Sequence, residues 1–126
     1  MTKPIASIAL MQLYESGLFQ LDDPVSRFIP ELANLKVLKG SKCSETYTVR
    51  DPQREMTVRD LLTHTSGLVA PFSNSKIFEG TQVGRLYRKA NLYSGANLSS
   101  MVKVLGTLPL HCDPGSEWNY GISTDL

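Results

Sequence analysis

Residues 1–17 read MTKPIASIALMQLYESG and predict the helix around which the rest of the chain is organised. Pro4 fits the first turn of a helix, and Gly17, followed by Leu18, is placed for a left-handed C-terminal cap. A helix that is apolar on nearly every side is typical of one buried on all sides, so we expect this helix to pass through a core. Its apolar residues are Ile5, Ala6, Ile8, Ala9, Leu10, Met11, Leu13 and Tyr14.

Lys3 is the unexpected residue of this helix. It places a cation in the first turn, where the helix dipole favours negative charge. Taken alone, a lysine near a chain terminus is most simply a solvated side chain. At the mouth of a buried helix it indicates either a structural or a chemical role.

The first half of the remaining chain predicts short elements. Asp22 or Asp23 is placed to cap a short helix with Pro24 at its first position. Residues 36–42 are typical of a solvated loop, and residues 47–49 predict a short strand before a turn.

The second half is predicted to be mainly helical. Thr57 and Asp60 form a capping-box pattern for a helix that ends at Gly67. Residues 70–97 predict a long loop with a helical turn near 83–89, a length that favours a pocket wall or lid. A further helix is expected to begin at Asn97 or Ser99 and to stop at Pro109, residues 118–120 are expected to be extended, and another helix is expected to begin at Ser123.

Composition excludes several functions. The 126 residues are 41% hydrophobic and 20% charged, and the net charge is +1 with both signs interspersed. No basic face appears, so we expect no nucleic-acid partner, and no apolar run reaches the roughly 20 residues that cross a bilayer.

Asp22 and Asp23 have no histidine or third carboxylate close by, so we expect neither a metal nor a cofactor. Cys43 and Cys112 lack metal-ligand spacing, which favours two free thiols and leaves a disulfide open. The sequence indicates neither an oligomeric state nor a compartment.

Three stretches together resemble the serine β-lactamase and penicillin-binding-protein-like superfamily. They are TKPIASIALMQLYESGLFQLDDPVSRFIPEL (2–32), MTVRDLLTHTSGL (56–68) and LPLHCDPGSEWNYGISTDL (108–126). Their order and spacing are similar to those of the class C-like group, which includes family VIII carboxylesterases. The resemblance implies a domain with an antiparallel sheet flanked by helices, a helical domain, and an active site between the two.

The resemblance also assigns roles to two residues. The nucleophile of the superfamily is the serine of an S-x-x-K motif at the start of a buried helix, and Lys3 matches the lysine of that motif. The serine position would immediately precede Met1. Tyr120 matches the tyrosine of the second motif, Tyr-x-Asn or Tyr-Ser-x, but Ile122 replaces the asparagine, which favours an esterase-like hydrolase. The third motif, Lys-Thr-Gly or His-x-Gly, would lie beyond Leu126 together with most of the sheet.

The implied chemistry is acyl transfer through an acyl-enzyme on a small-molecule ester or amide. A serine three residues before a lysine shares its helix face, and the helix N-terminus favours negative charge on the serine oxygen. A buried, neutral lysine can accept the serine proton, and a tyrosine can share the proton transfer. Lys3 and Tyr120 are therefore the predicted catalytic residues.

The remaining candidate catalytic residues are interpreted as structural residues or chance motif matches. His64 is expected to bond the last carbonyls of a helix beside Gly67 rather than to act as a general base. Trp118 is expected to pack in the core or in a pocket wall. The strings Ser73–Lys76 and Ser100–Lys103 also read S-x-x-K, but neither precedes a buried apolar helix, so they are interpreted as chance matches.

The sequence thus predicts an α-rich α+β fragment that supplies the central helix and much of the helical domain, with most sheet strands missing. Residues 1–126 are expected to form a partial domain, because both ends fall inside elements. Such a chain is expected to be inactive as given and to expose the apolar surface of its first helix, so that it aggregates or is marginally folded. The alternative is a non-catalytic helical interaction module, or pseudoenzyme, with the same fold.

Overall fold

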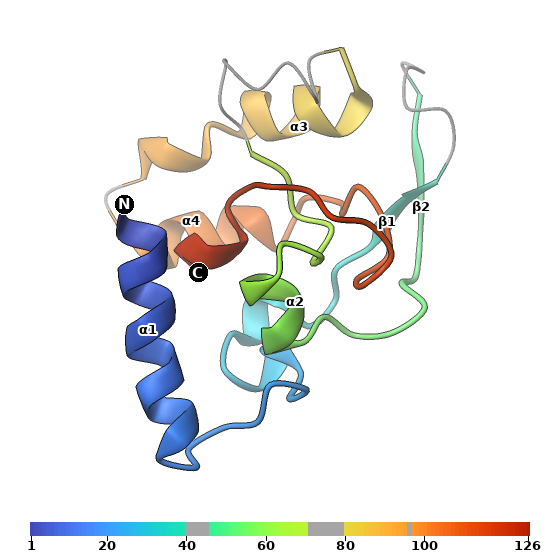
Figure 1. Cartoon of the computed structure of the whole chain (residues 1–126). Coiled ribbons are helices and arrows are strands. Elements are labelled where there is room, and N and C mark those ends of the chain that lie inside the picture. Colours follow the sequence, from blue (N-terminus) through green and yellow to red (C-terminus); the bar gives the residue numbers. More distant parts are fainter. Residues whose placement is uncertain (40–45, 71–79, 96) are drawn as a thin grey trace.

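The computed structural model describes residues 1–39, 46–70, 80–95 and 97–126. The helices are α1 (Thr2–Glu15), α2 (Val58–Leu62), α3 (Gln82–Ala90) and α4 (Leu98–Leu105), and the strands are β1 (Val37–Lys39) and β2 (Thr48–Arg50). Single 3₁₀ turns lie at η1 (Val25–Arg27), η2 (Pro30–Leu32), η3 (Leu92–Ser94) and η4 (Ser123–Asp125). The predicted α-rich α+β class is confirmed, and the two strands of the described part form a small antiparallel pair (Figure 1).

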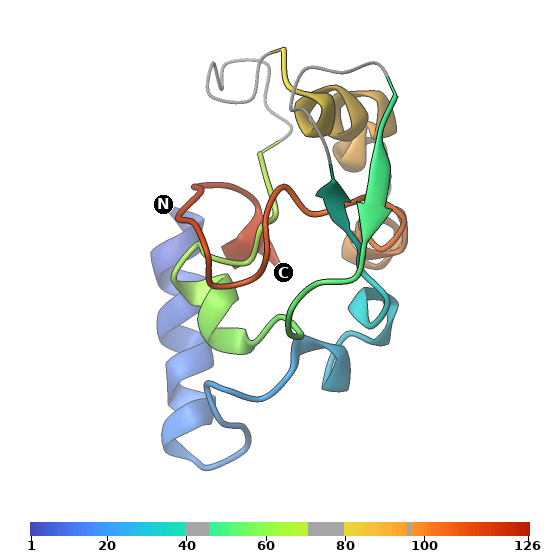
Figure 2. The same ribbon diagram turned by 90° about the vertical axis from the view of Figure 1, so that its right-hand side faces the viewer.

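Helix α1 lies along one side of the molecule, and the rest of the chain meets only its inner face (Figures 1 and 2). The prediction that this helix is buried on all sides is wrong for the described chain, because α1 contains no buried residue. Ile5 and Ile8 are 69% and 64% exposed. A helix that is apolar all round needs neighbours on every side, and here neighbours lie on one side only. The exposed apolar surface itself agrees with the expectation for this helix without covering layers.

The predicted C-terminal cap of α1 is confirmed. Gly17 has a φ of 75°, and its N–H donates to the carbonyl of Tyr14 at 2.9 Å. The N–H of Leu18 donates to the carbonyl of Leu13 at 3.1 Å. These two bonds form a Schellman motif, in which a left-handed glycine satisfies the last carbonyls of the helix.

Helix α2 begins as predicted and ends earlier than predicted. The hydroxyl of Thr57 accepts from the N–H of Asp60, and the carboxylate of Asp60 accepts from the N–H of Thr57, which completes the capping box. The helix ends at Leu62, and His64 adopts the left-handed φ of 57° that follows it. Gly67 is therefore not the helix cap that the sequence suggested.

The segment before η1 corrects a second predicted cap. Neither Asp22 nor Asp23 caps a helix, because the 3₁₀ turn at η1 has no side-chain cap. Instead, Asp22 pairs with Arg59 at 2.8 Å. The backbones of this segment and of α2 also bond, with the N–H of Val25 donating to the carbonyl of Met56 at 2.8 Å. Long-range pairing with the start of α2 therefore takes the place of the predicted local cap.

The remaining elements differ from the predictions mainly in extent. The predicted strand lies at β2, but its partner β1 occupies part of the predicted 36–42 loop. The predicted helical turn near 83–89 is the full helix α3, whose N-cap Thr81 accepts from the N–H of Gly84. Asn97 caps α4 as expected, by accepting from the N–H of Ser100 at 2.9 Å.

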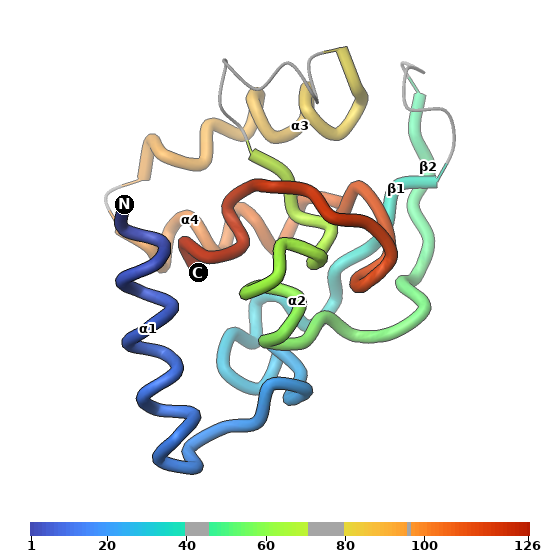
Figure 3. Tube along the Cα trace, in the orientation of Figure 1, coloured from blue at the N-terminus to red at the C-terminus, as the bar shows by residue number. Residues whose placement is uncertain are grey.

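The core lies between α2, α3, α4 and the C-terminal segment, as the path of the chain in Figure 3 shows. Its fully buried members include Leu68, Val83, Tyr87, Leu105, Leu110 and Ile122. In the described residues, no helix is both long and apolar enough to cross a membrane. Cys112 is a buried free thiol, whereas Cys43 lies outside the described residues.

Candidate active site

Two segments that are far apart in the sequence are held together by backbone hydrogen bonds next to helix α1. We call residues 63–70 and 111–123 the interlocked segments. They carry the THTSGL and WNY stretches of two of the blocks that resemble the superfamily, and the structure brings the two into direct contact. Backbone N–H groups of His111, Gly115 and Asn119 donate to the carbonyls of Gly67, Thr65 and His64, at 2.9, 2.7 and 2.8 Å.

Close packing fixes the register of the interlocked segments. Gly67 has a φ of 84°, and a Cβ at this position would collide with the carbonyl oxygen of Cys112. Only glycine combines this backbone conformation with so close an approach. The buried hydroxyls of Ser66 and Ser123 also lie 2.8 Å apart and bond to each other. The segment that carries Tyr120 is thus held in place by the loop that follows α2.

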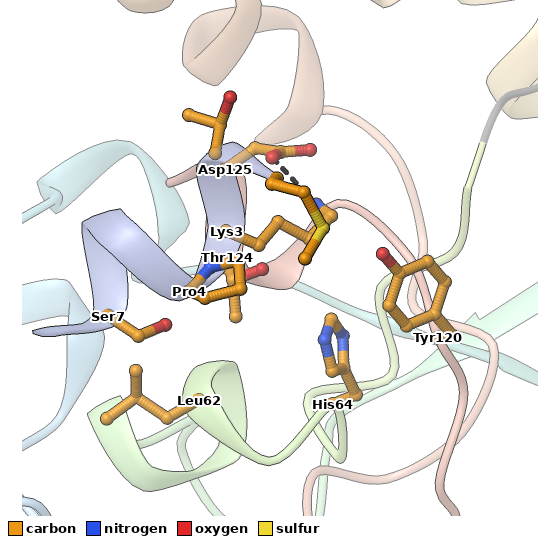
Figure 4. Close-up of a pocket in the computed structure, with 10 residues that line it drawn as sticks. Lys3, Pro4, Ser7, Leu62, His64, Tyr120, Thr124 and Asp125 are labelled. Carbon is orange, nitrogen blue, oxygen red and sulfur yellow. Dashed lines mark ion pairs between the residues drawn. The ribbon is translucent and has the colours of Figure 1, made fainter.

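A cavity of about 530 Å³ lies between the start of α1 and the interlocked segments. Both predicted catalytic residues line it, although they are separated by most of the chain. The other lining residues are Met1, Thr2, Pro4, Ser7, Leu62, His64, Thr124 and Asp125. Figure 4 shows Lys3 and Asp125 side by side, with His64 and Tyr120 next to each other across from them.

Lys3 enters the cavity from the first turn of α1. Its Nζ lies 2.7 Å from Oδ1 of Asp125, and its side chain is 21% exposed. The Nζ also lies 5.8 Å from the centroid of the Tyr120 ring, within the range of a cation–π contact. The N-terminal end of the helix dipole is positive and disfavours a cation in the first turn. The carboxylate of Asp125 offsets this by pairing with the Lys3 ammonium.

Tyr120 faces the cavity from the segment after the Pro-Gly turn. Its ring contacts the ring of His64 at a centroid distance of 4.7 Å and an angle of 41°. The Trp118 ring lies 6.4 Å from the Tyr120 ring and is 64% exposed, so Trp118 lies at the surface and not in the core. The Tyr120 ring therefore contacts the imidazole of His64 and lies within cation–π range of the Lys3 ammonium.

His64 is the cavity residue that the sequence interpretation missed. It was expected to bond helix carbonyls, but its ring points into the cavity. Nδ1 is buried and has no hydrogen-bond partner in the described part of the chain. Burial lowers the pKa of His64, the Lys3 ammonium lowers it further, and Asp125 acts in the opposite direction. The only sequence signal for this placement was the position of His64 inside the MTVRDLLTHTSGL block.

Of the two other S-x-x-K strings, Ser100–Lys103 lies outside the lining of this cavity. The hydroxyl of Ser100 donates to Oδ1 of Asn97 at the start of α4, and Ser73–Lys76 lies outside the described residues. No cluster of three metal-ligating side chains occurs in the described ranges.

The arrangement can move a proton. An amine at a helix start and a phenol share one cavity, and these are the two groups that the resemblance predicts for the S-x-x-K and tyrosine motifs. The beta-lactamase family model matches residues 1–125, so this chain belongs to the beta-lactamase family.

Similar proteins include acyltransferases and an esterase. The acyltransferase calJ of Penicillium decumbens is 37% identical over 125 residues, which are 98% of this chain and 28% of that protein. The lovastatin esterase of Penicillium rubens is 34% identical over 98% of this chain and 29% of its own length. The unliganded structure of simvastatin synthase from Aspergillus terreus matches with a TM-score of 0.70 and 31% identity, over 98% of this chain and 29% of that one. The chain thus spans less than a third of the length of these relatives.

Proposed function

We propose that this chain is part of a serine acyl-transfer enzyme, esterase-like or acyltransferase-like, that acts through an acyl-enzyme on a small-molecule ester or amide. Residues 1–126 form part of a larger β-lactamase-like domain and contribute its lysine and tyrosine. In its neutral amine form, Lys3 accepts the proton of the serine that precedes it in the S-x-x-K motif, and Tyr120 shares proton transfer to the leaving group. The similarity to an acyltransferase and to an esterase supports this reaction class.

One observation carries the proposal. Lys3 and Tyr120 come from opposite ends of the chain, yet the Lys3 Nζ lies 5.8 Å from the centre of the Tyr120 ring in one cavity. Ile122 instead of asparagine in the second motif favours an ester substrate over a β-lactam. Asp125 keeps Lys3 directed toward this cavity through their ion pair.

We further propose that residues 1–126 alone form no acyl-enzyme. In the described part of the chain, Lys3 Nζ makes no hydrogen bond to a hydroxyl, so no nucleophile is paired with it. A fluorophosphonate is expected to leave the intact mass of this polypeptide unchanged. A mass increase equal to one phosphonyl group would contradict this part of the proposal.

The function itself is tested on a longer chain that carries a serine directly before Met1. The fluorophosphonate is expected to label that serine, and Lys3→Ala is expected to slow labelling about 100-fold or more, the usual scale of general-base catalysis. Tyr120→Phe is expected to slow it less. Lys36→Ala and Tyr47→Phe serve as matched controls, because both side chains lie outside the cavity lining. Absence of labelling at that serine would overturn the function.

An interaction module without catalysis is the second candidate. The exposed apolar residues of α1, with Ile5 and Ile8 more than half exposed, are the observation that favours it. Absence of labelling in a longer chain that is folded by circular dichroism would leave this candidate ahead.

A further inference from the structure

His64 contacts the tyrosine segment twice. Its ring packs on the ring of Tyr120 at a centroid distance of 4.7 Å, within the range of favourable aromatic contacts. Its carbonyl accepts from the N–H of Asn119, the residue before Tyr120, at 2.8 Å. One residue therefore restrains both the backbone and the side chain of the second motif.

The backbone of His64 is in a conformation that side chains rarely adopt. Its φ of 57° lies in the left-handed region, where histidine is enriched but still uncommon. Such a conformation persists where surrounding structure imposes it, and it is most common at functional sites. Here it turns the chain after α2 so that the imidazole points toward the cavity (Figure 4).

Burial and the Lys3 ammonium favour a neutral imidazole at His64, whereas the carboxylate of Asp125 favours the protonated form. Lys3 faces it from α1, Asp125 from η4, and the phenol of Tyr120 from the segment between them. Protonation would add a second cation opposite Lys3. It would also leave the buried Nδ1–H without an acceptor among the described residues, which is costly.

We propose that His64 is a positioning residue for Tyr120: its neutral imidazole packs against the phenol and holds it beside Lys3, and protonation of the imidazole releases that arrangement. The positioning stands on geometry alone, and only its catalytic consequence rests on the proposed function. The site is then sensitive to acid through a residue that does not itself touch the reacting atoms.

The chain supplies its own reporter for this proposal. Trp118 is the single tryptophan of the sequence, and its ring lies 6.3 Å from that of His64. A protonated imidazole near an indole quenches its fluorescence, so Trp118 emission is expected to report the titration of His64. We expect a transition with its midpoint below about 6.5, the ordinary imidazole pKa.

Two substitutions separate the ring from the charge. His64→Phe keeps an aromatic ring that cannot be protonated, and His64→Asn removes the ring but tolerates the left-handed backbone. His111→Gln is the control, because His111 is the other histidine of the chain. The Trp118 transition is expected to disappear in both His64 variants and to persist in His111→Gln.

Positioning is measured by NMR on the Tyr120 ring resonances, assigned with Tyr120→Phe. We expect His64→Phe to keep the neutral-pH ring shifts at acid pH, and His64→Asn to lose them at every pH. Circular dichroism checks folding, and if His64→Asn unfolds, His64→Phe alone decides. Tyr120 shifts in His64→Phe that still move with the wild-type midpoint would overturn the proposal, as would a folded His64→Asn with wild-type Tyr120 shifts. Neither measurement needs activity, so a failure of the proposed function would remain separately visible.

Discussion

Helix α1 and the interlocked segments show that apolar content and burial are different properties. Helix α1 is apolar on nearly every side, yet none of its residues is buried. The interlocked segments contain histidine, threonine, serine and asparagine. Their residues Leu68, Val69 and Ile122 are nevertheless fully buried. Burial depends on how many sides of a segment receive neighbours, and the interlocked segments enclose each other whereas α1 is covered on one side.

This difference divides the cavity into two unlike walls. Tyr120 and His64 belong to a wall fixed by backbone hydrogen bonds and by a glycine contact that leaves no space. Lys3 belongs to a helix that meets the rest of the chain on one face, and its ion pair with Asp125 bridges the two walls. The following substitutions test whether the two regions really differ in this way.

The largest expected loss of stability is that of Gly67→Ala, measured against Gly17→Ala, because both glycines have a left-handed backbone. Gly67→Ala combines the left-handed penalty with a collision against Cys112, so we expect it to lower the free energy of unfolding by about 3–5 kcal/mol. Gly17→Ala meets nothing within 4 Å, so only the left-handed penalty of about 1–2 kcal/mol applies. Urea denaturation measures both, and equal losses would show that the interlocked segments are not tightly packed.

The next effect concerns the carboxylate of Asp60, which is 3% exposed at the start of α2. Burial acts to raise its pKa, but hydrogen bonds from Arg54 and from Thr57 outweigh it and the pKa is lowered. Its contribution is therefore present above the unfolded pKa of about 3.9 and lost as the pH falls through the lower folded value. Asp60→Ala is expected to cost about 2 kcal/mol at neutral pH, because it removes the return bond of the capping box to the N–H of Thr57 and leaves Arg54 without its carboxylate partner.

Asp22→Ala is the control for Asp60, because Asp22 pairs with Arg59 while 73% of its side chain is exposed. We expect Asp22→Ala to lower the free energy of unfolding less than Asp60→Ala does, because solvent screens the exposed pair. Thermal denaturation between pH 2 and pH 7 measures both variants. A loss of acid sensitivity in Asp22→Ala but not in Asp60→Ala would contradict the assignment.

A smaller effect compares two isoleucines. Ile122 is fully buried in the interlocked segments, so Ile122→Val is expected to cost about 0.5–1.5 kcal/mol. Ile8 is 64% exposed on α1, so Ile8→Val is expected to stay within about 0.5 kcal/mol of the parent chain. Chemical denaturation measures both variants. If the Ile8 variant lost as much stability as the Ile122 variant, the Ile8 side chain would be buried and not exposed as the structure has it.

The smallest expected effect on stability comes from the ion pair between Lys3 and Asp125. A double-mutant cycle on Lys3→Ala and Asp125→Ala is expected to give a coupling of about 0.2–1 kcal/mol, because both side chains remain partly exposed. Raising the salt concentration is expected to reduce it. A coupling of several kcal/mol would mean that α1 is fixed as firmly as the interlocked segments.

The two proposed catalytic residues could be named from the sequence because a motif identifies residue types at fixed spacing. Lys3 and Tyr120 could be named in this way, although their roles still await the labelling experiment. His64 could not be recognised, because its placement depends on a left-handed backbone and on a ring contact with Tyr120. Nothing within a few residues of His64 indicates either feature.

The sequence by itself determined the features that close within four or five residues. These are the capping box of Thr57 and Asp60, the glycine cap at Gly17 and the cap of α4 at Asn97. Each is a hydrogen bond between near neighbours, so local chemistry suffices to predict it.

Only the tertiary structure decided which surfaces are covered and which residues meet. Asp22 bonds Arg59 in preference to capping a helix, and Gly67 accommodates Cys112 and does not end α2. Helix α1 stays exposed because burial requires partners that a helical pattern cannot specify. Contacts between residues far apart in the chain depend on how the whole chain packs, and for that reason the cavity that unites Lys3, His64 and Tyr120 became visible only in the fold.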